Sequence, residues 1–108
     1  MNIIKVLIAD DHALFREGTR NLIDQEKDMR VIGEASDGEE AVKLVTELKP
    51  HVVLMDIAMP AVNGIEATKQ IKARFPKTAV LILTAYDNDQ YIVALLEAGA
   101  AGYLLKDV

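Results

Sequence analysis

Apolar runs and helical stripes alternate along the whole chain, and this alternation limits the fold more than any other feature of the sequence. Apolar runs that predict strands buried on both faces lie at residues 3–9, 30–35, 51–55, 79–83 and 102–105. Between them, apolar residues recur at helical spacing within 14–23, 41–48, 65–75 and 92–96. Strict alternation of strands and helices predicts an α/β domain, with helices on both sides of a parallel sheet.

Two local signals mark helix ends within this alternation. Ser36 with Glu39, and Asp37 with Glu40 one residue later, both have the spacing of a capping box before the second helix. Gly99 stands where the end of the fourth helix needs left-handed backbone geometry. Both signals support the helices that the periodicity predicts.

For the five strands we predict a doubly wound, flavodoxin-like sheet with the order 2-1-3-4-5. The chain ends two residues after Lys106, so the helix that would follow the fifth strand is missing from this chain. In this topology the first and last helices share one face of the sheet. We therefore expect an exposed apolar patch of a size seldom left bare on a monomer, and association through that patch.

The composition excludes several classes of protein. A length of 108 residues, of which 51% are hydrophobic, fits one small domain. A net charge of −5 without a cluster of Lys and Arg argues against direct contact with nucleic acid. The absence of Cys excludes thiolate chemistry, and no apolar run reaches the roughly 18 residues of a membrane span. Because residues 1–10 lack signal-peptide features, we expect a cytoplasmic location without membrane contact.

Polar residues follow four of the predicted strands at the point where each strand ends. Asp10 and Asp11 follow the first strand, Asp56 the third, Thr84 the fourth and Lys106 the fifth. In a parallel sheet these ends meet at one rim, which is where open α/β sheets bind ligands. The sequence thus predicts a rim site of clustered carboxylates with one ammonium and one hydroxyl.

Charge alone indicates what such a site binds. Two carboxylates about 5 Å apart repel by roughly 3 kcal/mol at an effective dielectric near 20, so clustering them requires a counter-charge. Mg²⁺ prefers one or two carboxylates, waters and a substrate phosphate, which matches a site of this acidity without His or Cys ligands. With the metal bound, Asp56 can attack an in-line phosphoryl group while Lys106 and Thr84 contact its oxygens. The product is an acyl phosphate.

Five motifs in this order resemble the receiver domain of two-component response regulators, over the whole chain. They are Ala9-Asp10-Asp11-His12, Val53-Leu54-Met55-Asp56-Ile57-Ala58-Met59-Pro60, Asn63-Gly64, Leu83-Thr84-Ala85, and Gly99-Ala100-Ala101-Gly102-Tyr103-Leu104-Leu105-Lys106. The phrases at residues 11–18 and 103–107 look most like the NarL/FixJ-type subgroup with LuxR-type output. The resemblance implies a CheY-like fold and makes residues 1–108 a receiver domain without its last helix and without an output domain.

The resemblance also implies roles for individual residues. It makes Asp56 the phosphoacceptor, with Asp11 and Asp56 as direct Mg²⁺ ligands and Asp10 acting through a water. The backbone carbonyl of Ala58 would complete the protein ligands, and Lys106 would contact the phosphoryl group. The chain would catalyse at most its own phosphorylation and dephosphorylation, so we do not expect an enzyme.

A switch and a set of partners are implied in the same way. Thr84 and Tyr103 would be the switch pair, with the Thr84 hydroxyl moving toward the phosphate and the Tyr103 ring turning inward. A sensor histidine kinase would donate the phosphoryl group, and the subgroup's receivers are expected to form dimers. DNA would be bound only through a helix-turn-helix domain that this chain lacks, in the regulation of transcription.

The sequence leaves other interpretations open. Asp10 and Asp11 could simply begin a helix, His12 beside them is interpreted as a structural helix-start residue, and Tyr103 could merely pack on an edge strand. A haloacid-dehalogenase-type phosphatase needs a second Asp where Ala58 stands, and a nucleotide or flavin binder needs a phosphate loop where the acidic pair stands. The nearest alternative is a receiver-like module that is not phosphorylated and serves in protein interaction or dimerisation.

Overall fold

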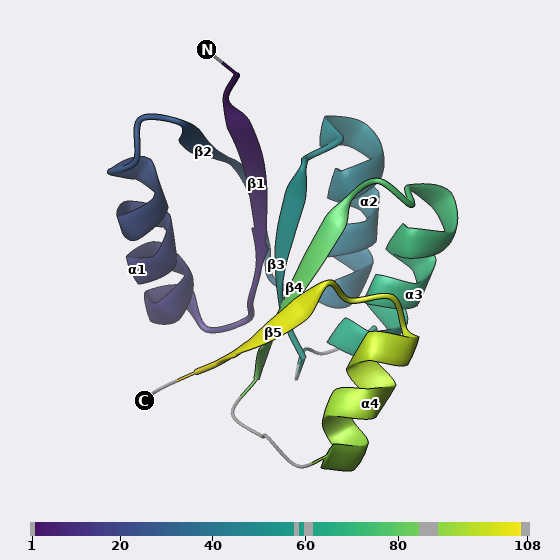
Figure 1. Cartoon of the computed structure of the whole chain (residues 1–108). Coiled ribbons are helices and arrows are strands. Elements are labelled where there is room, and N and C mark those ends of the chain that lie inside the picture. Colours follow the sequence, from purple (N-terminus) through teal and green to yellow (C-terminus); the bar gives the residue numbers. More distant parts are fainter. Residues whose placement is uncertain (1, 58, 60–61, 85–88, 107–108) are drawn as a thin grey trace.

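The sheet and its helices are seen in a computed structural model that describes residues 2–57, 59, 62–84 and 89–106 (Figure 1). Five parallel strands lie in the order β2-β1-β3-β4-β5. The strands are β1 (Ile4–Ala9), β2 (Met29–Ala35), β3 (Val52–Asp56), β4 (Ala79–Thr84) and β5 (Gly102–Leu105). The helices are α1 (Ala13–Asp24), α2 (Gly38–Leu48), α3 (Gly64–Arg74) and α4 (Asp89–Glu97). The predicted α/β fold and strand order are confirmed.

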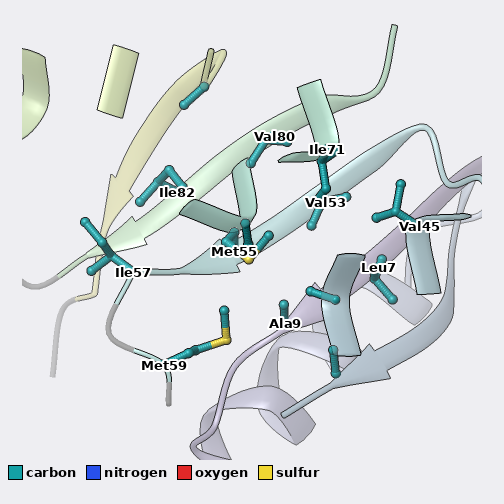
Figure 2. Packing of buried hydrophobic residues seen from close by; sticks show 14 of the residues in the cluster. Leu7, Ala9, Val45, Val53, Met55, Ile57, Met59, Ile71, Val80 and Ile82 are labelled. Carbon is teal, nitrogen blue, oxygen red and sulfur yellow. The ribbon is translucent and has the colours of Figure 1, made fainter. Parts of the chain in front are cut away.

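Alternate residues of the central strands supply a separate core on each face of the sheet. On one face Leu7 and Met55 pack in a large cluster that includes residues of α2 and α3, as Figure 2 shows for its buried members. On the other face Val6 and Ile8 pack with Ile23 of α1 in a smaller cluster. The period of two along each strand therefore explains why these strands are apolar on both faces.

The ends of α2 and α4 test the two predictions made for helix ends. Asp37 caps α2, because its Oδ1 accepts the N–H of Glu40 at 2.7 Å, while Glu40 Oε1 accepts the N–H of Ser36 at 2.8 Å. Of the two predicted pairs, the later one supplies the cap, although the Glu40 side chain accepts from Ser36 and not from Asp37. Gly99 has φ +105° just after α4, which confirms the predicted left-handed position. Lys49, after α2, also has a positive φ of 50°, which the sequence did not indicate.

An apolar patch is exposed on the face of the sheet that carries α1. The exposed fractions are 86% for Leu14 and 68% for Leu22, both on α1, and 52% for Leu104 on β5. The alternation of side chains along the paired strands places Leu104 on the same face as α1. Exposed apolar side chains thus lie on the face where the patch was predicted, and the size of the patch stays a prediction. Within the described residues, no helix is both long and apolar enough to cross a membrane.

Copies of this chain are predicted to associate through this apolar patch as the concentration rises, because burying apolar surface is favourable by about 25 cal/mol per Å². Sedimentation velocity over a range of loading concentrations measures this association. Leu22→Glu should weaken it, whereas Val93→Glu, at a half-exposed position on α4, should leave it unchanged. A strictly monomeric profile at high concentration, or equal effects of both changes, would contradict the prediction.

Candidate functional site

The carboxyl ends of the strands bring the predicted site residues to one rim. Hydrogen bonds continue the sheet past the strand ends: the Asp10 N–H donates to the Ala35 carbonyl at 2.9 Å, and the Lys106 N–H donates to the Thr84 carbonyl at 2.7 Å. Asp56 is the last residue of β3, so its side chain leaves the sheet at the same level. The rim predicted from parallel topology is therefore present.

The Lys106 ammonium links two carboxylates that come from different strand ends. Its Nζ lies 2.8 Å from Asp10 Oδ2 and 3.1 Å from Asp56 Oδ2. The exposed fractions of the side chains are 9% for Lys106, 0% for Asp10 and 4% for Asp56. The cluster thus holds a positive and two negative groups largely out of water, where their interaction is stronger than at the surface.

The pKa values of this cluster reflect both burial and pairing. Burial alone would raise the pKa of Asp10, but hydrogen bonds from Lys106 and the His12 N–H, with the Lys106 charge, hold it below its ordinary value of 3.8. Burial alone would lower the pKa of Lys106, but hydrogen bonds to Asp10 and Asp56 and their charges hold it above its ordinary value of 10.5. Asp10 and Lys106 are thus both favoured in their charged forms by their partners.

The carboxylates are arranged as a dication would require. One ligand atom from each of Asp10, Asp11, His12 and Asp56 can be chosen so that all lie within 4.8 Å of one another. Carboxylate oxygens are hard ligands of the kind that Mg²⁺ and similar cations prefer. The donor set therefore fits a divalent cation. Ala58, whose carbonyl was predicted to join this set, lies outside the described residues.

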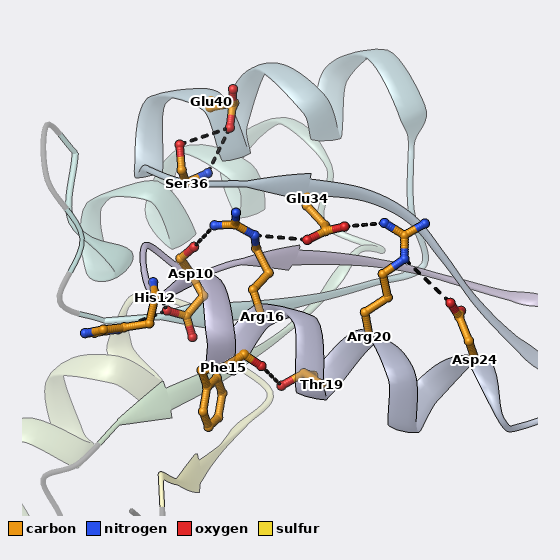
Figure 3. A network of polar contacts seen from close by, with 10 residues as sticks. All are labelled: Asp10, His12, Phe15, Arg16, Thr19, Arg20, Asp24, Glu34, Ser36 and Glu40. Atoms are coloured by element: carbon orange, nitrogen blue, oxygen red, sulfur yellow. Dashed lines mark hydrogen bonds and ion pairs between the residues drawn. The ribbon is translucent and has the colours of Figure 1, made fainter.

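Arg16 was not singled out in the sequence, yet it ties the acidic loop to the edge of the sheet (Figure 3). Its Nη1 donates to the Asp10 carbonyl at 2.6 Å, and its Nε donates to Glu34 Oε1 at 3.0 Å. Glu34 on β2 also pairs with Arg20 of α1. Glu34 is a lone carboxylate within the otherwise apolar run 31–35, and such a residue requires a cationic partner. This was the one signal in the sequence that could have pointed to an arginine contact at this edge.

Phe15 is a second residue that the periodicity did not identify as part of the site. Its ring lies under the Lys106 ammonium, with Nζ 4.4 Å from the ring centroid. Such a cation–π contact favours the charged form and restricts the lysine side chain. Phe15 lies within the apolar helical stripe of residues 14–23, and no sequence pattern distinguishes a packing role on that helix face from a contact with a lysine 91 residues later.

The two predicted switch residues lie on neighbouring strands. Thr84, at the end of β4, is fully buried and pairs in register with Leu105. Tyr103 on β5 has an exposed fraction of 39% and pairs in register with Ile82. The structure thus shows a buried hydroxyl residue at the rim and a partly exposed ring on the edge strand, and the switch role of the pair stays a prediction.

Asp10 is expected to make the stability of the metal-free protein depend on pH in the acid range. Its folded pKa lies below 3.8, so its contribution to stability is present above that value and is lost as the pH falls through the folded pKa. Urea unfolding between about pH 5 and about pH 2 measures this loss. Asp10→Asn should lose less stability over the interval than the unchanged chain, and parallel profiles would contradict the assignment.

Comparison with known proteins agrees with this geometry. The family model of the response regulator receiver domain matches residues 6–108. The chain is 46% identical to the transcriptional regulatory protein DegU of Brevibacillus brevis over 107 residues, covering 99% of the chain and 45% of that protein. It is 45% identical to the transcriptional regulatory protein LiaR of Bacillus subtilis, covering 96% and 49%.

Among solved structures, the signal receiver domain of NarL from Mycobacterium tuberculosis is similar, with a TM-score of 0.95 and 35% identity. The match covers 100% of this chain and 87% of that one. This chain spans about half the length of the curated relatives it matches. The resemblance found in the five motifs is therefore confirmed, and the chain belongs to the response regulator receiver domain family, with transcriptional regulators of the NarL and DegU type among its relatives.

Proposed function

We propose that this receiver domain is a switch that accepts a phosphoryl group on Asp56. The observation that carries the proposal is the placement of the Lys106 ammonium within 3.1 Å of an Asp56 carboxylate oxygen and 2.8 Å of an Asp10 oxygen, at the ligand-binding rim of the sheet. A nucleophilic carboxylate beside a fixed positive charge is suited to an incoming phosphoryl group. Asp56 is the phosphoacceptor in this proposal, and Lys106 and Thr84 support the reaction.

The transfer begins with attack by an Asp56 carboxylate oxygen on the phosphorus of a phosphohistidine or a small phosphodonor. A new P–O bond forms, the bond from phosphorus to the donor breaks, and the donor leaves with the electron pair and takes a proton from solvent. The Lys106 ammonium stabilises the negative charge on the phosphoryl oxygens, and the Thr84 hydroxyl donates a hydrogen bond to one of them. The chain modifies itself, so it acts as a regulator that catalyses at most its own phosphorylation and dephosphorylation.

The acidic cluster supplies the cation site for this reaction. Asp11 and Asp56 are proposed as direct ligands, with Asp10 acting through a water and the Ala58 backbone carbonyl as a further ligand. A bound Mg²⁺ would neutralise charge on the phosphoryl oxygens. The support for this part is the clustering of oxygen ligands within 4.8 Å.

Phosphorylation is proposed to shift a conformational equilibrium of the domain. Phosphate contacts with Thr84 and Lys106 favour the active arrangement, and the Tyr103 ring turns inward as Thr84 moves. This conformational change would be recognised at the face formed by α4 and β5. The support is the position of Thr84 at the rim and of Tyr103 on the edge strand.

The partners follow from the relatives, which are about twice as long as this chain. We include in the proposal a sensor histidine kinase as phosphodonor, self-association of the domain, and a cytoplasmic location. Residues 1–108 act as the receiver, and DNA is bound by a separate helix-turn-helix domain of the parent protein, which controls transcription. DegU and LiaR are transcriptional regulatory proteins, and their similarity to this chain supports this role.

Intact-mass spectrometry after incubation with acetyl phosphate and Mg²⁺ tests the proposal. We expect a single phosphoryl adduct that is lost in Asp56→Asn and in a metal-free control, because the first lacks the nucleophile and the second lacks the counter-charge for the phosphoryl oxygens. Asp24→Asn, which changes an exposed carboxylate on α1, should keep the adduct. No adduct on a chain shown to be folded by circular dichroism would favour the interaction module instead.

A further inference from the structure

The His12 imidazole lies among the carboxylates of the proposed cation site. Its Nδ1 is 3.2 Å from Asp10 Oδ1, 3.3 Å from Asp11 Oδ1 and 3.7 Å from Asp56 Oδ2. Around a six-coordinate ion with bonds of roughly 2.1 Å, adjacent ligand atoms are separated by about 3 Å and opposite ones by about 4 Å. The distances from Nδ1 to Asp11 and Asp56 therefore match those between fellow ligands of one ion.

A capping role at the start of α1 does not account for this side chain, whose Nδ1 lies in hydrogen-bond contact with Asp10 Oδ1 at 3.2 Å. His12 is the N-cap residue of α1, yet its ring makes no capping hydrogen bond. Ser, Thr, Asp and Asn are the residues that stabilise a helix from this position. Instead, the His12 N–H donates to Asp10 Oδ1 at 2.8 Å, so the backbone itself holds the ring against the carboxylates.

Binding a metal through His12 would require little rearrangement. The His12 side chain is 67% exposed, so it can adjust its torsion angles without repacking the core. Asp11 beside it is one third exposed, while Asp10 and Asp56 are held in place by burial and by Lys106. The site thus combines two fixed carboxylates with two ligands that can adapt to an incoming ion.

We infer that His12 is a direct ligand of the bound cation and biases this site toward first-row transition-metal dications over Mg²⁺. The inference rests on the proposed function, because it deepens the cation site of that proposal. Imidazole nitrogen suits transition metals, whereas Mg²⁺ favours oxygen ligands and keeps its waters. One nitrogen added to the direct carboxylate ligands Asp11 and Asp56 therefore discriminates between the two classes of ion.

Pulsed electron paramagnetic resonance of the Mn²⁺-loaded chain gives a direct readout. We expect nitrogen-14 modulation from one coordinated imidazole, lost in His12→Phe and in His12→Asn. The chain has only two His, and His51→Asn is the matched control. Asn can still accept the hydrogen bond that the Lys5 N–H donates to His51 Nδ1. That control should keep the modulation.

Equilibrium binding of Mn²⁺ in competition with Mg²⁺ gives the second readout. The preference for Mn²⁺ over Mg²⁺ should fall at least about tenfold in His12→Phe. Loss of an outer-shell partner already lowers metal affinity by about 10–100-fold, and loss of a direct ligand should cost no less. The inference would be overturned if the unchanged chain showed no nitrogen-14 modulation, or if a folded His12→Phe kept the same preference for Mn²⁺ over Mg²⁺. Neither result would affect the phosphoryl adduct on Asp56. If neither ion binds, the inference and the cation site of the proposed function both fail.

Discussion

Lys106→Met is expected to lower the free energy of unfolding of the metal-free protein by about 3–5 kcal/mol. Methionine keeps much of the length of the side chain but removes the charge that lies 2.8 Å from Asp10 and 3.1 Å from Asp56. Both carboxylates are buried, so the change leaves two negative groups close together without their counter-charge. The loss of the contact with the Phe15 ring adds to the effect.

Urea unfolding with and without Mg²⁺ measures this effect and identifies its cause. If repulsion between carboxylates is responsible, Mg²⁺ should stabilise Lys106→Met more than it stabilises the unchanged chain, because the cation supplies the missing positive charge. Lys69→Met, at an exposed position on α3, should change stability by no more than about 0.5 kcal/mol. If metal-free Lys106→Met had the same free energy of unfolding as Lys69→Met, the buried ion pairs of Lys106 would not stabilise the fold.

The same substitution should slow phosphorylation of Asp56 by acetyl phosphate at saturating Mg²⁺. Removal of one fixed group that stabilises developing charge typically costs about 10²–10³ in rate. With circular dichroism confirming that the Lys106→Met chain is folded in Mg²⁺, a slow reaction reports the role of Lys106 in the transfer itself. An unchanged rate would remove Lys106 from the proposed chemistry and leave it a structural role.

The rim of the site was predictable because topology fixes it. Once the apolar runs are strands of a parallel sheet, Asp10, Asp56 and Lys106 follow three strand ends and must meet, whatever the details of packing. The ion pairs of Lys106 with both carboxylates agree with that argument. The capping of α2 was predictable only to within one residue, since two overlapping pairs had the same spacing and the structure uses Asp37.

The supporting contacts could not be predicted because they depend on how the helices sit on the sheet. Arg16 reaches the Asp10 carbonyl and Glu34 only because α1 packs against β2 at a particular rotation. The position of the His12 ring likewise depends on backbone angles at the start of α1, which a residue type does not determine. Periodicity identifies which face of a helix is buried, but it does not say which side chain at its end meets a given strand.

Gly38→Ala is expected to lower the free energy of unfolding by about 3 kcal/mol or more. A Cβ atom at Gly38 would lie 1.7 Å from the Val62 carbonyl oxygen and 2.6 Å from its carbonyl carbon, so the backbone would have to move. Gly64, two residues after Val62, is similarly close to the backbone of Asp56, with its own Cβ position 2.4 Å from the Asp56 carbonyl oxygen. The start of α2 thus packs against the segment that leads from β3 into α3.

Gly18→Ala is the matched control for this effect. Gly18 lies inside α1, and a Cβ atom there would meet nothing within 4 Å. The same change of residue should therefore raise the free energy of unfolding by about 0.5–1 kcal/mol, through the higher helix propensity of alanine. The opposite signs of the two substitutions, measured by urea unfolding, separate close packing from helix propensity.

Displacement of Val62 should also be visible at the site, because the segment it belongs to connects Asp56 to α3. In a Gly38→Ala chain that still folds, backbone amide chemical shifts should change at Val62 and toward Asp56, and they should stay unchanged there in Gly18→Ala. A Gly38→Ala chain as stable as the Gly18 variant, with native shifts, would mean that the two segments do not pack as described. Lower stability with native shifts at Asp56 would confine the strain to the start of α2 and exclude its transmission to the phosphoacceptor.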